Sequence, residues 1–405
     1  MTDALSPEAT FPMARAARCP FDPPPELSRR REQEPVSRVR LWDGGTAWLV
    51  TRYADVRELL RDRRAGVDVT EPGFPHTNAV SKARDAQMKT LMQMDAPEHT
   101  THRRRLTADF MIKKMEALRP TIQELVDGLI DDLLAGPNPA DLVEAFALPV
   151  PSLVICELLG VPYADRAFFQ RVAGELVMDQ GDPAQAMAAS RELEAYLERL
   201  VEKRNAEPGD DVLSRLAVEH YRTGEMTRRE IATMGQLLLV AGHDTTANMI
   251  ALGTAALLAH PEQLSAIRDT GDPALVAGAV EELLRYLSIT HTEARRVARE
   301  DLAIGGRLIR KGEGIIAVKS TANRDPAAFP DPGTLDVRRR ARHHVAFGYG
   351  AHQCLGQSLA RVELQVVFGT LFRRVPTLAP AVPLEELTFK PDAVFYGVRD
   401  LPVTW

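Results

Sequence analysis

Cys354 stands in the string FGYGAHQCLG (347–356), where three glycines and a histidine accompany the cysteine. Glycine at that density does not suit a helix or a strand, so the string is predicted to be a tight loop. The residues that follow, LGQSLARVELQVVF, repeat apolar side chains at helical spacing, which places Cys354 at or just before a helix N-terminus. There the helix dipole and free N–H groups favour a thiolate. A thiolate on a rigid loop, with no second cysteine near it in the sequence, suits a single axial bond to a metal.

Three other interpretations of Cys354 are open from its spacing alone. A free cysteine is most often inert and buried in a core, although glycines rather than packing residues flank this one. Cys354 could be a nucleophile with His352 as its base, but side chains two residues apart in a turn seldom face each other correctly. It could bind zinc with His343, His344 and His352, a spacing that supplies no second thiolate and matches no common zinc pattern.

The whole string resembles the haem-binding loop of the cytochrome P-450 superfamily at six positions: Phe347, Gly348, Gly350, His352, Cys354 and Gly356. The resemblance implies haem b as the cofactor and the Cys354 thiolate as the axial ligand of its iron, which promotes cleavage of the O–O bond. It also implies that Phe347 covers the sulfur and that His352 reaches a haem propionate. The glycines would let the loop and the following helix approach the ring.

A long apolar segment, 231–259, carries the polar string AGHDTT at its middle, and we expect a buried central helix rather than a membrane span. Ala241 and Thr245 are one turn apart and share a face. The P-450 central helix has the same A-G-x-[DE]-T pattern. The resemblance implies that Ala241 and Gly242 border the haem and that Asp244 and Thr245 relay protons. From the residues alone, Asp244 could be a cap and Thr245 could bond back to a carbonyl.

The string EELLRY places Glu282 and Arg285 at i, i+3 on a predicted helix. On an exposed face such an ion pair contributes little, but the preceding ALVAGAV is apolar, so this pair is expected to be buried. It matches the E-x-x-R motif of the same superfamily. The resemblance implies a structural role and a third member from a downstream arginine, which we assign to Arg338 in DVRRRARHH.

Haem propionates require cations and hydrogen-bond donors. APEHTTHRRRL places His99 and Arg103 one helical turn apart, and RRVARED places Arg296 at the start of a predicted strand. By resemblance these three residues hold the propionates together with His352. Arg295 could replace Arg296 through a shift of register, and ordinary solvated charge is the alternative for basic residues of this kind.

The 405-residue chain is predicted to be mainly α with a minor antiparallel β part. Helical periodicity marks 53–62, 118–136, 190–207 and 273–287, and strand-like runs occur at 39–51, 296–318 and 393–405. No linker or repeat divides the chain, so residues 1–405 are predicted to form one domain with an α-rich lobe, a small β-rich lobe and an extended N-terminal strap over about 1–35. In the P-450 fold, the haem lies between the long central helix and the cysteine loop.

Composition excludes several classes of protein. A net charge of −6 gives no cause to expect nucleic acid, and three widely separated cysteines argue against a disulfide framework and for a reducing compartment. The first 27 residues have no apolar core, so neither a signal peptide nor a membrane anchor is expected. A cytoplasmic monomer is therefore predicted.

The resemblance implies a monooxygenase that uses O2 and two electrons to hydroxylate or epoxidise a bulky apolar molecule, such as a polyketide, terpenoid, steroid or xenobiotic. No G-x-G-x-x-G follows a predicted strand, so a separate ferredoxin and its reductase are expected to supply the electrons. The basic clusters at 103–105, 113–114 and 338–342 are candidates for ferredoxin docking, or are ordinary solvated charge. Candidate substrate contacts are Leu237, Val240, Ile289, Thr290, His291, Thr292, Val394 and Phe395.

Two alternatives remain. A haem-binding sensor or carrier belongs to another class, and the Asp244–Thr245 pair disfavours it because a carrier needs no proton relay. A peroxide-driven enzyme of the same fold would work without a ferredoxin.

Overall fold

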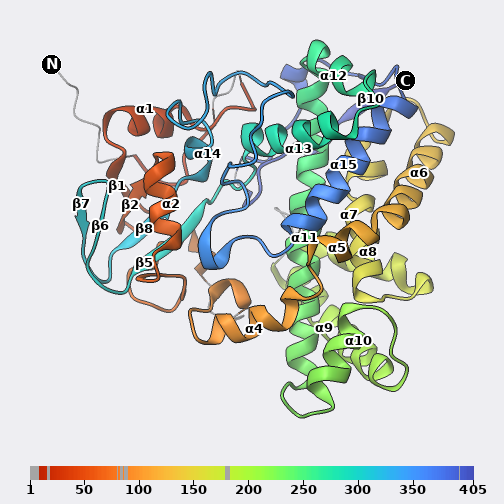
Figure 1. The fold of residues 1–405 in the computed structure, drawn as a ribbon, viewed down its shortest axis with the longest axis horizontal. Helices are drawn as coiled ribbons and strands as arrows, with labels where there is room; N and C mark the ends of the chain where they lie inside the picture. The colour runs from red at the N-terminus through yellow and green to blue at the C-terminus, as the bar shows by residue number, and fades with distance from the viewer. Residues whose placement is uncertain are drawn as a thin grey trace. The chain divides into compact units, whose positions relative to one another are not determined.

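The computed structural model describes residues 9–15, 19–79, 81–82, 85, 90–177, 183–391 and 393–405. Contacts between Cα atoms divide the chain into two compact units, each assembled from separated segments. The first unit comprises Met1–Thr101, Ala274–Gln357 and Ala393–Tyr396, and the second comprises His102–Pro273, Ser358–Asp392 and Gly397–Trp405. The elements of both are labelled in Figure 1. The single domain expected from the sequence stays a prediction.

The first unit contains a five-stranded sheet with the strand order β1-β2-β8-β5-β3. Its strands are β1 (Val36–Arg40), β2 (Thr46–Val50), β3 (Ala65–Gly66), β5 (Ala294–Ala298) and β8 (Gly314–Ala317). A separate hairpin consists of β6 (Leu302–Ile304) and β7 (Arg307–Ile309). The strands predicted within 39–51 and 296–318 are confirmed. All pairs in the large sheet are antiparallel except β2 with β8, which are parallel with Val50 opposite Ala317.

The first unit also contains helices, some of which contact the strands. They are α1 (Pro25–Gln33), α2 (Tyr53–Arg61), α13 (Pro273–Leu287) and the single turn α14 (Lys319–Ala322). Val56 and Leu59 of α2 pack in one buried cluster with Ile315 and Ala317 of β8. Apolar side chains at i, i+3 spacing on α2 thus meet alternate residues of a strand, which is the arrangement that their periodicities predict.

The extended strap predicted over about 1–35 is wrong for its last part, since residues 25–33 form α1. Pro25 occupies the first helical position, where a residue without an N–H costs nothing and a fixed φ is already suitable. The proline-rich sequence therefore starts a helix instead of continuing an extended segment. Residues 1–8 and 16–18 of the predicted strap lie outside the described residues.

The second unit is mainly helical. Its helices are α5 (Ile112–Ala117), α6 (Arg119–Ala135), α7 (Pro149–Leu159), α8 (Arg166–Val177), α9 (Pro183–Ala206), α10 (Val212–Leu216), α11 (Arg228–Leu258), α12 (Pro261–Arg268) and α15 (Gln357–Arg374), while α4 (Glu98–Thr107) enters it from the first unit. A small sheet joins β4 (Ala140–Asp141), β10 (Pro402–Thr404) and β9 (Ala379–Pro380) in that order, all antiparallel. Within the predicted strand pattern 393–405, only 402–404 form a strand.

Helix α11 is the predicted central helix, and Figure 1 shows it as the longest helix of this unit, beside α7 and α9. A capping box starts it: the Thr227 hydroxyl accepts the Glu230 N–H, and the Glu230 carboxylate accepts the Thr227 N–H at 2.7 Å. Side chains on all its faces are buried, from Ile231 to Leu257, as expected for a helix inside a bundle. Despite that apolar character, none of the helices in the described part of the chain meets the length and hydropathy of a membrane span.

Candidate active site

The loop around Cys354 is closed by its own backbone. The Cys354 N–H donates to the Phe347 carbonyl at 2.8 Å, and the Gly348 N–H donates to the Val345 carbonyl at 2.9 Å. The Cys354 side chain is exposed on this loop, and α15 begins three residues later. The predicted position of the cysteine, just before a helix N-terminus, is therefore confirmed, and the packed-core interpretation of Cys354 is wrong.

Gly350 and Gly356 of this loop differ in how closely other protein atoms approach them. Gly350 has φ +76°, and a Cβ built on it would lie 2.5 Å from the Leu60 carbonyl oxygen of α2, so no other residue fits without moving the loop. Gly356 is the opposite case, because a Cβ there would meet no protein atom within 4 Å. Protein packing therefore explains Gly350, whereas Gly356 borders open space at the start of α15.

The zinc interpretation of this region does not agree with the histidine contacts. His344 is buried, with its Nε2 3.0 Å from the Glu281 carboxylate and its Nδ1 accepting the Ala346 N–H at 3.1 Å. His343 instead stacks on Phe329 with ring centroids 4.4 Å apart. In the described ranges, no group of three His, Cys, Asp or Glu side chains could hold a metal ion. These contacts give the zinc interpretation no support in the described part of the chain.

Several of the predicted propionate-binding groups lie in the first unit. The His99 and His352 rings are in contact, with centroids 4.0 Å apart and planes at 36°. Arg296 is buried on β5, and this burial lowers the pKa of its guanidinium to about 10. Its Nη1 donates to the Arg295 carbonyl at 2.8 Å. Arg103 follows one turn after His99 on α4 and is half-buried.

Because successive side chains of a strand point to opposite faces, the side chains of Arg295 and Arg296 lie on opposite faces of β5. Arg295 is directed to Asp85, 3.5 Å from its carboxylate, and lies over the Phe74 ring. The protein thus supplies Arg295 with a carboxylate and an aromatic face, while Arg296 is buried, donates to a backbone carbonyl and interacts electrostatically with Asp95. A thiol, two imidazoles and this buried guanidinium are groups that fit the iron and the propionates of haem.

The polar string on α11 makes contacts within the helix and with α7. The Thr245 hydroxyl donates to the Ala241 carbonyl at 2.8 Å, which is the back-bond that the sequence left open. The Asn248 side-chain amide donates to both the Asp244 carbonyl and the Asp244 carboxylate, each at 2.8 Å. A Cβ on Gly242 would lie 2.8 Å from Ile155 of α7, so helix packing explains this glycine, which the sequence assigned to the cofactor.

Burial controls the ionisation of the histidine in the same string. His243 is buried, and this burial together with the charge on Lys390 lowers the pKa of His243 to about 4. Its imidazole is therefore neutral at ordinary pH and does not add a charge beside Asp244.

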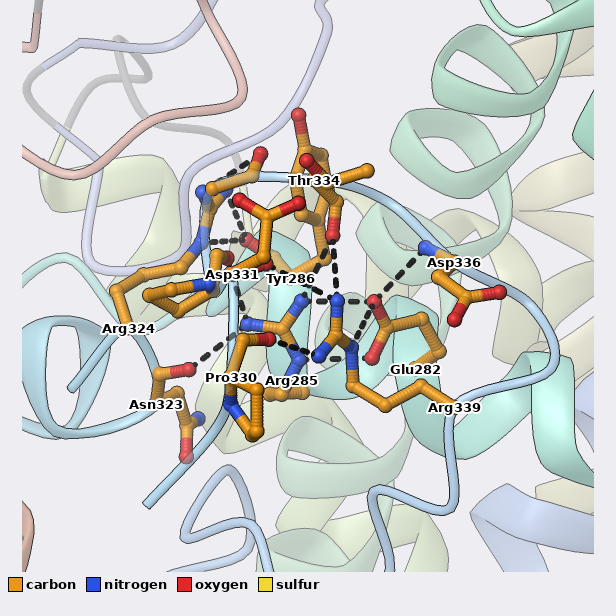
Figure 2. Close-up of polar contacts among 12 residues, drawn as sticks. Glu282, Arg285, Tyr286, Asn323, Arg324, Pro330, Asp331, Thr334, Asp336 and Arg339 are labelled. Carbon is orange, nitrogen blue, oxygen red and sulfur yellow. Dashed lines mark hydrogen bonds and ion pairs between the residues drawn. The ribbon is translucent and has the colours of Figure 1, made fainter. Parts of the chain in front are cut away.

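The predicted pair Glu282 and Arg285 is completely buried on α13. Its third member is Arg339 and not Arg338: the Arg339 Nε lies 3.1 Å from the Glu282 carboxylate, as Figure 2 shows. The local turn explains the correction: the Arg338 N–H donates to the Asp336 carboxylate, and the Arg338 side chain is left exposed. In a run of consecutive arginines, only this turn determines which one faces α13.

Two predicted substrate segments lie side by side in the first unit. Thr290 and Phe395 form an antiparallel bridge, and the His291 N–H donates to the Val394 carbonyl at 3.0 Å. The Tyr396 N–H donates to the Ile289 carbonyl at 2.7 Å. The other candidate positions, Leu237 and Val240 on α11, belong to the second unit, and Thr292 is half-buried.

Sequence reasoning missed three buried charged residues near the predicted positions. The Lys319 ammonium donates to the Thr290 hydroxyl at 2.9 Å, and the Glu293 carboxylate accepts the Lys319 and Ser320 N–H groups. Glu363 is buried on α15, where desolvation raises the pKa of its carboxyl to about 8. None of the three belongs to a motif or spacing that indicates a buried charge in the sequence.

Comparisons with known proteins agree with this geometry. The family model described as Cytochrome P450 matches residues 22–380. Cytochrome P450-SU2 of Streptomyces griseolus is 52% identical over 98% of this chain and 97% of that protein. The crystal structure of GfsF superimposes with a TM-score of 0.94 at 50% identity, covering 98% of this chain and all of that one. The mycinamicin VIII C21 methyl hydroxylase MycCI of Micromonospora griseorubida, solved with mycinamicin VIII bound, gives a TM-score of 0.90 at 40% identity, covering 98% and 100% of the two chains.

Proposed function

This chain belongs to the cytochrome P450 family, and on that premise we propose that it is a cytoplasmic, monomeric enzyme that hydroxylates a bulky apolar small molecule with electrons from a ferredoxin. Family membership makes it a haem b-dependent monooxygenase that acts on a small organic substrate with O2. The substrate class, the redox partner and the role of each residue are the parts that we propose.

Cys354 is the proposed axial ligand of the haem iron. The loop that holds it, closed by the Cys354–Phe347 hydrogen bond, and the absence of protein atoms beside Gly356 both support this assignment. When bound, haem supplies the activation of O2, which no side chain of the protein can perform. His99, Arg103, Arg296 and His352 are the proposed donors to its propionates.

Asp244 and Thr245 are the proposed proton relay. Asp244 is half-buried and holds one orientation through the amide of Asn248, while Thr245 donates to the Ala241 carbonyl one turn back. That hydroxyl is held by the helix backbone through this hydrogen bond. A carboxylate and a hydroxyl at adjacent positions can move a proton through water from one to the other.

A large, mainly apolar substrate is proposed. The MycCI structure carries mycinamicin VIII, and its fold matches this chain over nearly its full length. The proposed contacts combine apolar side chains, among them Leu237, Val240 and Phe395, with a few polar groups at 290–292. Such side chains suit an apolar ligand, and the polar groups can donate or accept the hydrogen bonds that orient it.

The observation that carries the proposal is the self-closed loop that presents Cys354 ahead of α15. The test is the visible spectrum of the purified ferric protein, titrated with a panel of hydrophobic natural products. A haem Soret band that shifts to shorter wavelength with one compound is expected, and absence of a Soret band after haem is supplied would contradict the assignment of Cys354.

Turnover separates the alternatives. With ferredoxin, its reductase and the compound that shifts the spectrum, Thr245→Ala is expected to form peroxide at the expense of product. A sensor or carrier would give no substrate-dependent turnover in the native protein. A peroxide-driven enzyme would give full turnover with peroxide alone and none of the ferredoxin dependence.

A further inference from the structure

Three polar side chains of the second unit form a hydrogen-bonded series that ends at Asp244. The Lys390 ammonium donates to the Asn248 side-chain oxygen at 3.2 Å. The Asn248 side-chain nitrogen donates to the Asp244 carboxylate at 2.8 Å. Asp244 and Asn248 are one turn apart on α11, whereas Lys390 comes from the C-terminal part of the chain, 142 residues away from Asn248.

The backbone near the C-terminus is shaped to bring Lys390 to this point. The Lys390 N–H donates to the Gly397 carbonyl at 2.9 Å, Phe389 and Val398 form a bridge, and the Arg399 N–H donates to the Thr388 carbonyl. A Cβ on Gly397 would lie 1.9 Å from the Asn248 side-chain oxygen. The chain therefore lies directly on Asn248, and only glycine at 397 permits that approach.

The donors and acceptors of this series fit in only one direction. An ammonium can only donate, so it fixes the Asn248 oxygen as its acceptor. The amide nitrogen must then point the other way, where it meets Asp244. An ionised carboxylate can only accept, so it is the partner that this nitrogen requires. Without Lys390, the amide nitrogen still faces the Asp244 carbonyl and carboxylate, but the amide oxygen loses the ammonium that anchors it, so the orientation of the amide is less firmly fixed.

The groups in and beside this series differ in burial and charge. Asn248 is 3% exposed, so its hydrogen bonds have little competition from water. His243 on α11 is neutral, as described above. Lys390 is half-buried, and its ammonium hydrogen-bonds to Asn248 of α11.

We propose that Lys390 is a positioning residue for the reaction: through Asn248 it holds the Asp244 carboxylate in the orientation from which Asp244 serves the proton relay. This inference rests on the role of Asp244 in the proposed function. A neutral amide has no acidic proton to pass on, so the series orients Asp244 and does not itself conduct protons. Lys390 thus acts on the proton-transfer step without touching substrate or haem.

The experiment compares the native holoenzyme with Lys390→Met, Lys390→Arg and Asn248→Ala. Lys390→Met keeps the length of the side chain and removes the donor, so product formed per electron pair is expected to fall by about three- to tenfold, the range expected for losing one hydrogen bond that positions a proton donor. Peroxide accounts for the difference, and the solvent isotope effect on turnover rises. Asn248→Ala gives the same result, and Lys390→Arg, which keeps the charge and the donors, retains most of the native coupling.

Three control measurements distinguish a positioning role of Lys390 from a general loss of stability, haem or substrate binding. Lys311→Met, at an exposed lysine of the first unit, is expected to behave like the native protein. Substrate affinity from the spectral titration and haem content are expected to be unchanged in Lys390→Met. If Lys390→Met and Lys390→Arg instead lose coupling and melting temperature together, the role is packing, and the inference is wrong.

Asp244→Asn separates this inference from the proposed function. If Asp244→Asn loses coupling while Lys390→Met and Asn248→Ala keep it, Asp244 is the relay and Lys390 does not position it. If Asp244→Asn keeps native coupling, the relay itself is wrong and the inference falls with it. The expected result is that Lys390→Met adds no further loss in the Asp244→Asn background.

Discussion

Glu282 and Arg285 form a two-point ion pair at 2.7 Å in which neither side chain has any exposed surface. Removing two charges from water is costly, so such a pair needs additional partners. Arg285 also donates to the Asn323 carbonyl at 2.9 Å, as Figure 2 shows, and to the Pro332 carbonyl at 2.9 Å. The pair therefore joins α13 to two points of the loop that follows α14.

Arg339 and Arg338 provide a matched comparison for this cluster. Arg339→Ala removes a guanidinium that bonds to buried Glu282 and is expected to lower the free energy of unfolding by about 1–3 kcal/mol. Arg338→Ala changes an exposed side chain of the same loop and is expected to stay within about 0.5 kcal/mol of the native protein. Denaturant unfolding of both variants measures the difference, and equal effects would contradict the assignment of Arg339.

Gly350 and Gly356 are expected to differ in what an added methyl group disturbs. Gly350→Ala combines a positive φ with a 2.5 Å approach to the Leu60 carbonyl oxygen, so it is expected to destabilise the protein by a few kcal/mol. Gly356→Ala meets no protein atom and is expected to leave the stability of the haem-free protein unchanged while it weakens haem binding.

Thermal melts of the haem-free protein and a haem titration, each on both glycine variants, measure these effects. A Gly356→Ala protein that binds haem as tightly as the native one would show that the space beside this residue does not receive the ring.

Glu363 predicts a specific dependence of stability on pH. Its carboxyl has a raised pKa of about 8, against 4.5 for an ordinary glutamate, because burial disfavours the charged form. The folded protein therefore keeps this proton after the unfolded chain has lost it. The contribution of Glu363 to stability is complete below pH 4.5 and is lost as the pH rises to about 8.

Glu363→Gln removes that dependence. The variant is expected to match the native protein near pH 4.5 and to become more stable than it by a few kcal/mol near pH 8. Denaturant unfolding at both pH values is the measurement, with Glu385→Gln at an exposed position as the control. An identical pH dependence in native protein and Glu363→Gln would show that Glu363 ionises normally.

Arg104 and Lys113 are exposed on the second unit and belong to the basic clusters proposed for ferredoxin docking. Reversing both charges, in Arg104→Glu with Lys113→Glu, is expected to slow electron transfer several-fold at low salt, because complementary charge raises the rate of encounter. Substrate affinity should not change. Stopped-flow reduction by ferredoxin at several salt concentrations measures this, with Lys311→Glu as the control, and an unchanged rate would exclude this part of the surface.

The sequence was most informative where short-range patterns decide the structure. Gly-Gly turns between strand-like runs predicted the hairpins, and helical periodicity predicted α2, α6, α9, α11 and α13. The position of Cys354 before α15 followed from the same rules. Pro25 shows the limit of local rules, since a proline cluster is compatible with an extended segment and with the start of a helix.

The remaining errors concern contacts between residues far apart in the chain. Nothing in a run of arginines distinguishes Arg339 from Arg338, because the turn at Asp336 decides which one reaches Glu282. The contact of Lys390 with Asn248 joins positions 142 residues apart. A single sequence carries no spacing signal for such pairs, and they become visible only when the fold places them together.

The parallel pairing of β2 with β8 has a consequence for synthesis of the chain. About 260 residues separate Val50 from Gly314. Strand β8, which pairs with β2 on the side opposite β1, is therefore synthesised only after all the helices from α4 to α13. At translation rates of roughly 5–20 residues per second this interval is roughly 15–50 s. During that time β1 and β2 form a hairpin with one unpaired edge on the ribosome, whereas the helices of the second unit can pack locally as they emerge. We therefore expect the N-terminal hairpin to be the segment of this protein most dependent on chaperones.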